Sequence, residues 1–115
     1  MCGDREWEDE QIIFTVLEGF AARHNLTRVI DGDARGADKI AGKWSHERDL
    51  RWAFPANWKK YGRSAGPIRN RAMLKHGRPD MVLAFHDHLE ESVGTKDMVT
   101  IAKEVRVPVY VIARA

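Results

Sequence analysis

Short apolar segments of β type alternate with amphipathic helical segments along almost the whole chain, and this alternation constrains the fold more than any other feature. Residues 81–85, Met-Val-Leu-Ala-Phe, are apolar throughout, which is typical of a strand buried on both faces of a parallel sheet. Parallel strands need crossover connections, which are usually helices. We therefore expect one α/β domain over residues 1–115, a Rossmann-like three-layer fold with a mostly parallel sheet.

Hydrophobic spacing and turn residues place the individual elements. The expected helices cover residues 8–24, 37–49, 68–76 and 95–105. The expected strands cover residues 27–30, 51–54, 81–85 and 107–112. Residues 55–67 contain two prolines and two glycines, which predicts an irregular loop.

The first strand departs from this pattern. A domain of this kind normally opens with a strand, but here the helical pattern begins at residue 8. Residues 1–3 provide only a stub, so we expect a first strand that is truncated or absent. Either the natural start lies upstream or a partner chain completes the sheet. We expect a homodimer, because the missing strand would otherwise leave an unpaired sheet position or an uncovered apolar face.

The cysteine count, the lengths of the apolar runs and the net charge narrow the class of protein. A single cysteine, Cys2, excludes an internal disulfide. No apolar run approaches the roughly 20 residues that span a bilayer, and residues 1–7 have no apolar signal region. We therefore expect a cytoplasmic protein with no membrane partner. The net charge of +2 does not single out nucleic acid, although basic residues recur along residues 59–78.

Three polar loops follow expected strands, so they should meet at one edge of the sheet. The first is Gly32-Asp-Ala-Arg-Gly-Ala-Asp38. Its glycines permit tight turns and close approach of a ligand, and the helix after it offers unpaired N–H groups to a phosphate. Arg35 can add a charge-assisted contact. The alternative is a plain turn in which Asp38 begins the helix.

The second loop, residues 55–70, combines aromatic and basic side chains. Trp58 and Tyr61 offer faces on which a base can stack, and Arg63 and Arg69 can meet anionic oxygens. Ser64 and Gly66 precede the expected helix at residue 68, a second candidate anion site. The alternative is that Trp58 packs into the core and the arginines are solvated.

The third loop is Ser92-Val-Gly-Thr-Lys-Asp97. Gly94 and Thr95 open the last expected helix, where backbone N–H groups and the hydroxyl can bind phosphate. Asp97 can act as a general acid or base if burial raises its pKa. The alternative is that Thr95 caps the helix and Asp97 complements its dipole.

His86-Asp87-His88 is the pattern that raises the question of a metal. No third ligand follows at a characteristic spacing. We expect no metal and no cofactor.

Taken together, these clusters resemble the YspA-like, cpYpsA-related branch of the SLOG superfamily, which is related to the LOG and DprA Rossmann-like domains. The similarity runs from about Gly3 to Val111. Its motifs are Gly3-Asp-Arg-Glu-Trp7, Gly32–Asp38, Ala56-Asn-Trp58, Gly62-Arg63, Ala65-Gly-Pro-Ile-Arg-Asn70, Asp80–Phe85 and Gly94-Thr95. The first motif is similar to the turn that follows the first strand in that branch.

The resemblance implies a phosphate-containing ligand derived from a nucleotide, such as ADP-ribose or an NAD-derived compound, held by a sensor or a sequestering protein. It also implies a phage or bacterial source. The residues expected to bind the ligand are Gly3, Arg5, Gly32, Asp33, Arg35, Gly36, Asp38, Trp58, Arg63, Gly66, Arg69, Asn70, Gly94 and Thr95.

Two other functions stay open. Related phosphoribohydrolases cleave the N-glycosidic bond of a nucleotide, and in such an enzyme Arg69 and Asp97 would be catalytic. Those enzymes carry a lysine where this chain has Asn70, and a Pro-Gly-Gly element that is absent here, so we favour binding over turnover. The second alternative is single-stranded nucleic-acid binding through residues 59–78.

Overall fold

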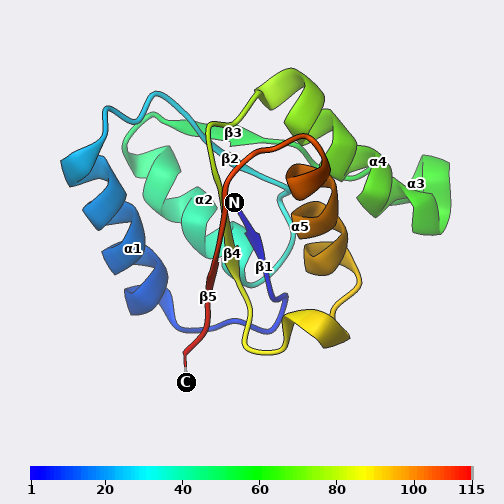
Figure 1. The fold of residues 1–115 in the computed structure, drawn as a ribbon, viewed down its shortest axis with the longest axis horizontal. Helices are drawn as coiled ribbons and strands as arrows, with labels where there is room; N and C mark the ends of the chain where they lie inside the picture. The colour runs from blue at the N-terminus through cyan, green and yellow to red at the C-terminus, as the bar shows by residue number, and fades with distance from the viewer. Residues whose placement is uncertain (115) are drawn as a thin grey trace.

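The computed structural model describes residues 1–114, in which strands and helices alternate as expected (Figure 1). The strands are β1 (Cys2–Gly3), β2 (Val29–Asp31), β3 (Arg51–Ala53), β4 (Val82–Phe85) and β5 (Val109–Ile112). The α-helices are α1 (Glu10–Arg23), α2 (Ala37–Glu47), α3 (Trp58–Tyr61), α4 (Ala65–Ala72) and α5 (Gly94–Glu104). Short turns of 3-10 helix cover Gly62–Ser64 and Leu89–Glu91, and a π-helical turn covers Met73–Gly77.

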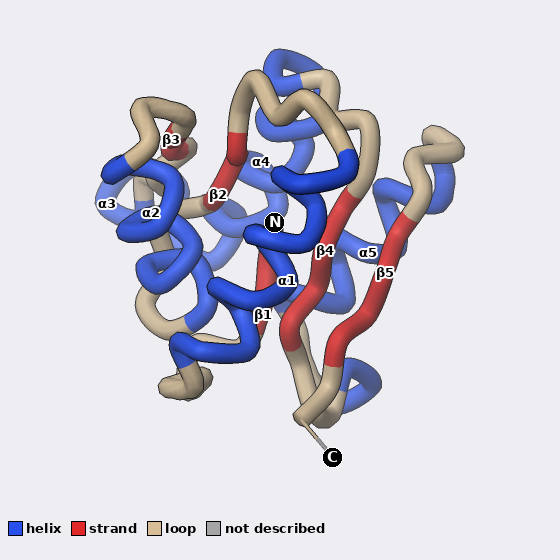
Figure 2. Tube along the Cα trace, turned by 90° about the vertical axis from the view of Figure 1, so that its left-hand side faces the viewer, coloured by secondary structure: helices blue, strands red, loops and turns tan. Residues whose placement is uncertain are grey.

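All the paired strands are parallel. β4 lies between β1 and β5, and β2 pairs with β3. The amino group of Met1 donates to the Ile30 carbonyl, which places β1 beside β2 and gives the spatial order β3-β2-β1-β4-β5 (Figure 2). The predicted mostly parallel sheet is confirmed. The first strand is present but has only two residues, as expected for a truncated strand.

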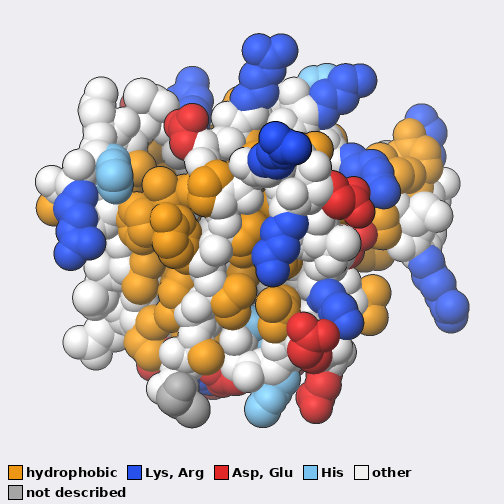
Figure 3. All heavy atoms as spheres, in the orientation of Figure 1, with side chains coloured by type: hydrophobic (Ala, Val, Ile, Leu, Met, Phe, Trp, Pro, Cys, Tyr) orange, Lys and Arg blue, Asp and Glu red, His pale blue; other side chains and the backbone are white. Residues whose placement is uncertain are grey.

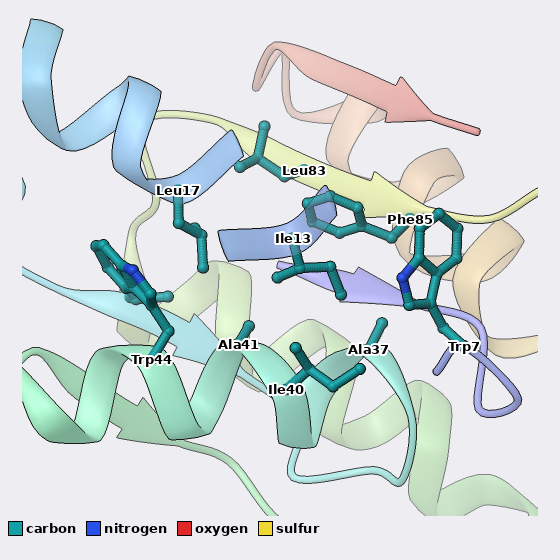
Figure 4. Close-up of a cluster of buried hydrophobic side chains, with 10 residues drawn as sticks. Trp7, Ile13, Leu17, Ala37, Ile40, Ala41, Trp44, Leu83 and Phe85 are labelled. Carbon is teal, nitrogen blue, oxygen red and sulfur yellow. The ribbon is translucent and has the colours of Figure 1, made fainter. Parts of the chain in front are cut away.

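The two faces of β4 divide the core into two clusters. Leu83 and Phe85 pack against α1 and α2. The ring centres of Phe85 and Trp7 lie 5.7 Å apart in an edge-to-face arrangement (Figure 4). Val82 and Ala84 instead pack against residues of α5 and the π-helical turn. All four side chains of β4 are buried, and full burial of one such side chain is worth about 1.5–3 kcal/mol. The sheet is therefore covered by helices on both faces, which confirms the three-layer α/β prediction.

The irregular loop predicted for residues 55–67 is wrong from Trp58 onward, because the chain becomes helical there. The Asn57 side chain caps α3 by accepting from the Lys60 N–H at 3.1 Å. α4 then begins at Ala65 rather than at Ile68. Pro67 allows this start because it lies in the first turn, where a helix does not need its missing N–H.

The turn into α2 depends on Gly36. Its φ of +78° is reached freely by glycine alone, and a Cβ built there would lie 2.4 Å from the Asp4 carbonyl oxygen. That carbonyl accepts from the Ala37 N–H at 3.1 Å. The turn before α2 is thus packed directly against the turn after β1.

Hydrophobic side chains gather on the molecular face between α1 and β5 (Figure 3). On the edge strand β5, Tyr110 is 51% exposed and Val111 is 47% exposed, and the Tyr110 ring lies 6.2 Å from that of Phe20. An unpaired edge of this kind is one that a second copy can cover. The expected homodimer stays a prediction.

None of the helices in residues 1–114 has the length and apolar character required to cross a membrane.

We expect Gly36→Ala to destabilise the fold by about 3 kcal/mol, because a disfavoured φ and a clash with backbone atoms act together. Urea denaturation of the variant and the wild-type chain measures the difference. Gly19→Ala is the matched control, since Gly19 lies inside α1 with open space around its Cβ position. That change should stabilise the chain by about 0.5–1 kcal/mol. Equal effects of the two substitutions would contradict the packing described for Gly36.

Candidate ligand-binding cleft

A cleft of about 540 Å³ opens at the carboxyl-terminal edge of the sheet, between the loops after β1, β2 and β4 and the helices α3 and α4. Its size is that of a typical small-molecule site. Most of the residues predicted to bind the ligand line it: Gly3, Arg5, Arg35, Asp38, Trp58, Arg63, Gly66, Arg69, Asn70, Gly94 and Thr95. The three separate loops therefore do converge on one site. That these residues bind a ligand stays a prediction.

Arg69 joins α4 to the first glycine loop. Its guanidinium donates to the Gly32 carbonyl, and its Nε donates to Asn70 Oδ1 at 2.9 Å. A Cβ on Gly32 would lie 2.2 Å from a guanidinium nitrogen, so only glycine lets Arg69 approach this closely. Burial lowers the pKa of Arg69 from its ordinary value, although an arginine side chain stays protonated in proteins. Arg69 supplies a fixed positive charge to the cleft wall.

Asn70 connects this arginine to the last loop. Its side chain is almost fully buried, and its Nδ2 donates to the Gly94 carbonyl at 3.2 Å and to Asp97 Oδ2 at 2.9 Å. Asp97 does not line the cleft. The carboxylate predicted as a candidate acid or base therefore lies behind Asn70 and holds that amide in place.

Asp38 is a buried carboxylate in the cleft wall, with an exposed fraction of only 5%. Its Oδ2 accepts from the Gly32 N–H at 2.9 Å and more weakly from the Ala34 N–H at 3.4 Å. Burial is the largest cause that raises its pKa, from an ordinary 3.8 to about 6. Asp38 is therefore more than the helix-start residue of the alternative interpretation.

The start of α5 presents free backbone donors to the cleft. Within residues 1–114, no hydrogen bond occupies the N–H groups of Gly94 or Thr95, while the next N–H, from Lys96, donates to Ser92 Oγ at 3.0 Å. Both residues line the cleft. With the dipole of an 11-residue helix behind them, these donors favour an anion.

The second candidate anion site, before α4, does not form as predicted. The chain enters α4 from a 3-10 turn, and the Ala65 N–H already donates to the Gly62 carbonyl. Gly66 instead makes room for an aromatic ring, because a Cβ there would lie 3.3 Å from the Trp58 side chain.

Trp58 lies at the wall of the cleft with 48% of its surface exposed, so the alternative that it packs into the core is wrong. The Arg5 guanidinium lies 5.3 Å from its ring centre, within cation–π range. Tyr61 is also exposed but does not line the cleft. Trp58 is thus the aromatic surface available to a base.

Three predicted residues do not line the cleft. Gly32 and Gly36 act through the close packing already described. Asp33 lies at a φ of +56°, and its carboxylate contacts Lys39 at 2.6 Å and Arg51 at 2.8 Å. The Lys39 contact lowers the pKa of Asp33 below its usual value. Arg51 also pairs with the fully buried Asp31, so this cluster fastens β2 to β3.

Sequence reasoning missed His86, Asp4 and Glu6, which also line the cleft. His86 directly follows β4, and that position at the carboxyl end of a strand was the available signal. Glu6 pairs with Arg35 at 2.5 Å, although both side chains are largely exposed.

Within residues 1–114, no three His, Cys, Asp or Glu side chains gather in a way that can hold a metal. His86 Nδ1 accepts from the His88 N–H at 2.9 Å, and Asp87 pairs with Arg114. Cys2 lines the cleft, but burial raises the pKa of its thiol to about 12, so it is not a reactive thiolate at neutral pH.

Comparison with known proteins identifies the family of this chain. The model of the YspA, cpYpsA-related SLOG family matches residues 1–61, which include the loops after β1 and β2 and Trp58. The chain is also 32% identical over 121 aligned positions to the Gene 61 protein of Mycobacterium phage D29, covering 93% of this chain and 89% of that relative. No solved structure gives a significant match.

The raised pKa of Asp38 predicts a pH dependence of stability. The folded state binds a proton at this carboxyl more tightly than the unfolded state, so the wild-type chain should lose stability as the pH rises from about 4 to above 6. Asp38→Asn removes this loss while keeping an acceptor for Gly32. The stability of wild type relative to this variant should fall by about 3 kcal/mol at most over that range.

Chemical denaturation from about pH 2 to about pH 8 measures this difference. Asp33→Asn provides a check on the sign, because the pKa of Asp33 is lowered. Wild type should therefore lose stability relative to Asp33→Asn as the pH falls below about 4. A difference between wild type and Asp38→Asn that stays constant with pH would contradict the burial described for Asp38.

Proposed function

The chain belongs to the YspA, cpYpsA-related SLOG family, and from this membership and the cleft we propose that it binds a phosphate-containing ligand derived from a nucleotide. The observation that carries the proposal is the convergence of anion-binding and base-stacking groups on one cleft. ADP-ribose and NAD-derived compounds are the ligands tested first. Binding serves either a sensor or a protein that sequesters the ligand.

Two sets of groups favour the phosphate. The free N–H groups at the start of α5 form one, and the arginines along the wall form the other. Arg69 is fixed by Gly32 and Asn70, whereas Arg63 has no hydrogen-bond partner among the described residues and is free to meet a ligand. A diphosphate can span both sets.

Trp58 supports the nucleotide part of the proposal. A flat, half-exposed indole at a basic cleft is a stacking surface for a base, and such stacking is worth about 1–3 kcal/mol per base. Arg5 already lies on this ring, so a base would stack beside the guanidinium or displace it.

Binding without turnover is the form of the proposal that the contacts favour. N-glycosidic cleavage needs a carboxylate that can reach the sugar, and the predicted candidate, Asp97, is engaged by Asn70 outside the cleft wall. The hydrolase alternative would have to use Asp38, Asp4 or Glu6, the carboxylates that do line the cleft. The phage relative is consistent with a phage or bacterial source for this chain.

A thermal-shift screen against ADP-ribose, NAD, nucleoside monophosphates and cyclic nucleotides tests the proposal. Binding of at least one compound should raise the melting temperature in a concentration-dependent way. Chromatography of the same mixtures should recover the compound intact. No stabilisation by any of them would contradict the proposal, and release of a free base would favour the hydrolase alternative. Affinity for single-stranded DNA that falls steeply with salt would favour the nucleic-acid alternative.

Arg63→Ala should weaken binding of the stabilising compound about tenfold or more, because it removes one charge-assisted hydrogen bond. Isothermal titration calorimetry measures the change. Arg71→Ala is the matched control, since Arg71 is exposed on the same helical region but does not line the cleft. Equal losses in the two variants would place the anion outside this cleft.

Ligand binding should also change tryptophan fluorescence, and the change should come from Trp58. Trp58→Phe is therefore expected to abolish most of the signal change while leaving the fold intact, since Trp58 is half exposed. Trp52→Phe is the control, because Trp52 is similarly exposed at 39% but lies on β3 outside the cleft. A signal that survives in Trp58→Phe and is lost in Trp52→Phe would exclude stacking on Trp58.

A further inference from the structure

The carboxylate of Asp38 has one oxygen fixed by the protein and one left over. Oδ2 is held by the N–H groups of Gly32 and Ala34. Within residues 1–114, no hydrogen bond reaches Oδ1. The same residues contain no fully buried polar side-chain atom without a partner, so Oδ1 must retain some accessible surface.

That accessible surface opens into the cleft. Asp38 is 95% enclosed by the protein, and it is one of the residues that line the cleft. Oδ1 is thus an unpaired hydrogen-bond acceptor in the wall of a site that four arginines also line.

Nearby cations neutralise this carboxylate only in part, because burial raises the pKa of Asp38 by more than the amino terminus and Arg69 lower it. The ion pairs found among residues 1–114 do not involve Asp38. Arg69, a half-buried cation of the same wall, directs its guanidinium to Gly32 and Asn70 instead. Because it is not fully neutralised, this buried carboxylate repels anions at short range, which disfavours a phosphate beside Oδ1.

We propose that Asp38 is a specificity-determining residue, which accepts a hydrogen bond from a neutral donor on the ligand and keeps the phosphate groups away from the α2 side of the cleft. The proposal rests on the proposed nucleotide-binding function. A nucleotide offers two such donors, a hydroxyl of the sugar and an exocyclic amine of the base. The free oxygen therefore selects for ligands that place one of them beside Asp38 and phosphate beside α5.

The free-energy cost of burying the Asp38 carboxylate supports a role for this residue in ligand recognition. A side chain that only fixed the turn at Gly32 would not need to be a carboxylate, since a carboxamide or hydroxyl oxygen accepts the same two N–H groups. The chain instead keeps an acidic group where burial disfavours its charge. A ligand donor offsets that cost when it binds.

Calorimetric titration of wild type and Asp38→Asn with AMP, 2′-deoxy-AMP, 3′-deoxy-AMP, IMP and pyrophosphate tests the proposal. Asn keeps an oxygen for Gly32 and presents an N–H₂ group where Oδ1 lies. In wild type, removal of the contacted donor should weaken binding about tenfold: one of the deoxy compounds if the donor is a hydroxyl, IMP if it is the amine. This discrimination should fall to within about twofold in Asp38→Asn.

Pyrophosphate should show the opposite change, with tighter binding to Asp38→Asn than to wild type. A purely structural role for Asp38 would weaken all the compounds together and cannot produce opposite signs. Asp49→Asn is the matched control, since it removes the same charge just after the other end of α2, outside the cleft. It should change neither the discrimination among the nucleotides nor the affinity for pyrophosphate.

Equal binding of all four nucleotides to wild type, or discrimination that persists in Asp38→Asn, would overturn the assignment and leave the proposed function intact. If AMP does not bind, the pyrophosphate titration is the test of the assignment. An affinity for pyrophosphate that is the same in wild type and in Asp38→Asn overturns it. Failure of the proposed function is distinct, because then no nucleotide-derived compound would stabilise the wild-type chain.

Discussion

The guanidinium of Arg69 donates to the carbonyl of Gly32, and the geometry of the cleft depends on this contact. It joins α4 to the loop after β2, two segments that are far apart in the sequence. Gly32 permits the approach because it has no Cβ, and its own N–H is held by Asp38. One peptide segment therefore positions a half-buried arginine through its carbonyl and a buried carboxylate through its N–H. The opposite charges stay close without pairing, which leaves each of them available to a ligand.

This separation of charge gives the cleft a direction. The free N–H groups lie at the start of α5 and the free acceptor lies at the start of α2, in a cleft that four arginines also line. A ligand with phosphate at one end and neutral donors at the other fits both halves, whereas a bare anion meets repulsion on the α2 side. The same argument explains why an exposed pair such as Arg35 and Glu6 adds little, because solvent screens both charges.

The sequence was sufficient to predict the parallel sheet, the buried β4 and the edge at which the loops meet, since these follow from hydrophobic spacing and strand direction. It also placed the two glycine loops that open the helices α2 and α5. It was not sufficient for α3, whose helical turn depends on a side-chain cap by Asn57. Nor could it assign Asp33, which pairs with Lys39 and Arg51. Pairings between distant segments decide which carboxylate faces a cleft, and spacing along the chain does not encode them.

Asn70 gives a physical reason to propose binding rather than turnover. The resembled phosphoribohydrolases carry a lysine at this position, and a lysine only donates hydrogen bonds. Asn70 both donates and accepts, and it uses the two capacities at once: it accepts from Arg69 and donates to Gly94 and Asp97. The one amide thereby fixes the arginine, ties α4 to the start of α5 and occupies the carboxylate of Asp97. The amide that orders this wall of the cleft is therefore the one that engages the carboxylate of Asp97, the candidate acid of the hydrolase alternative.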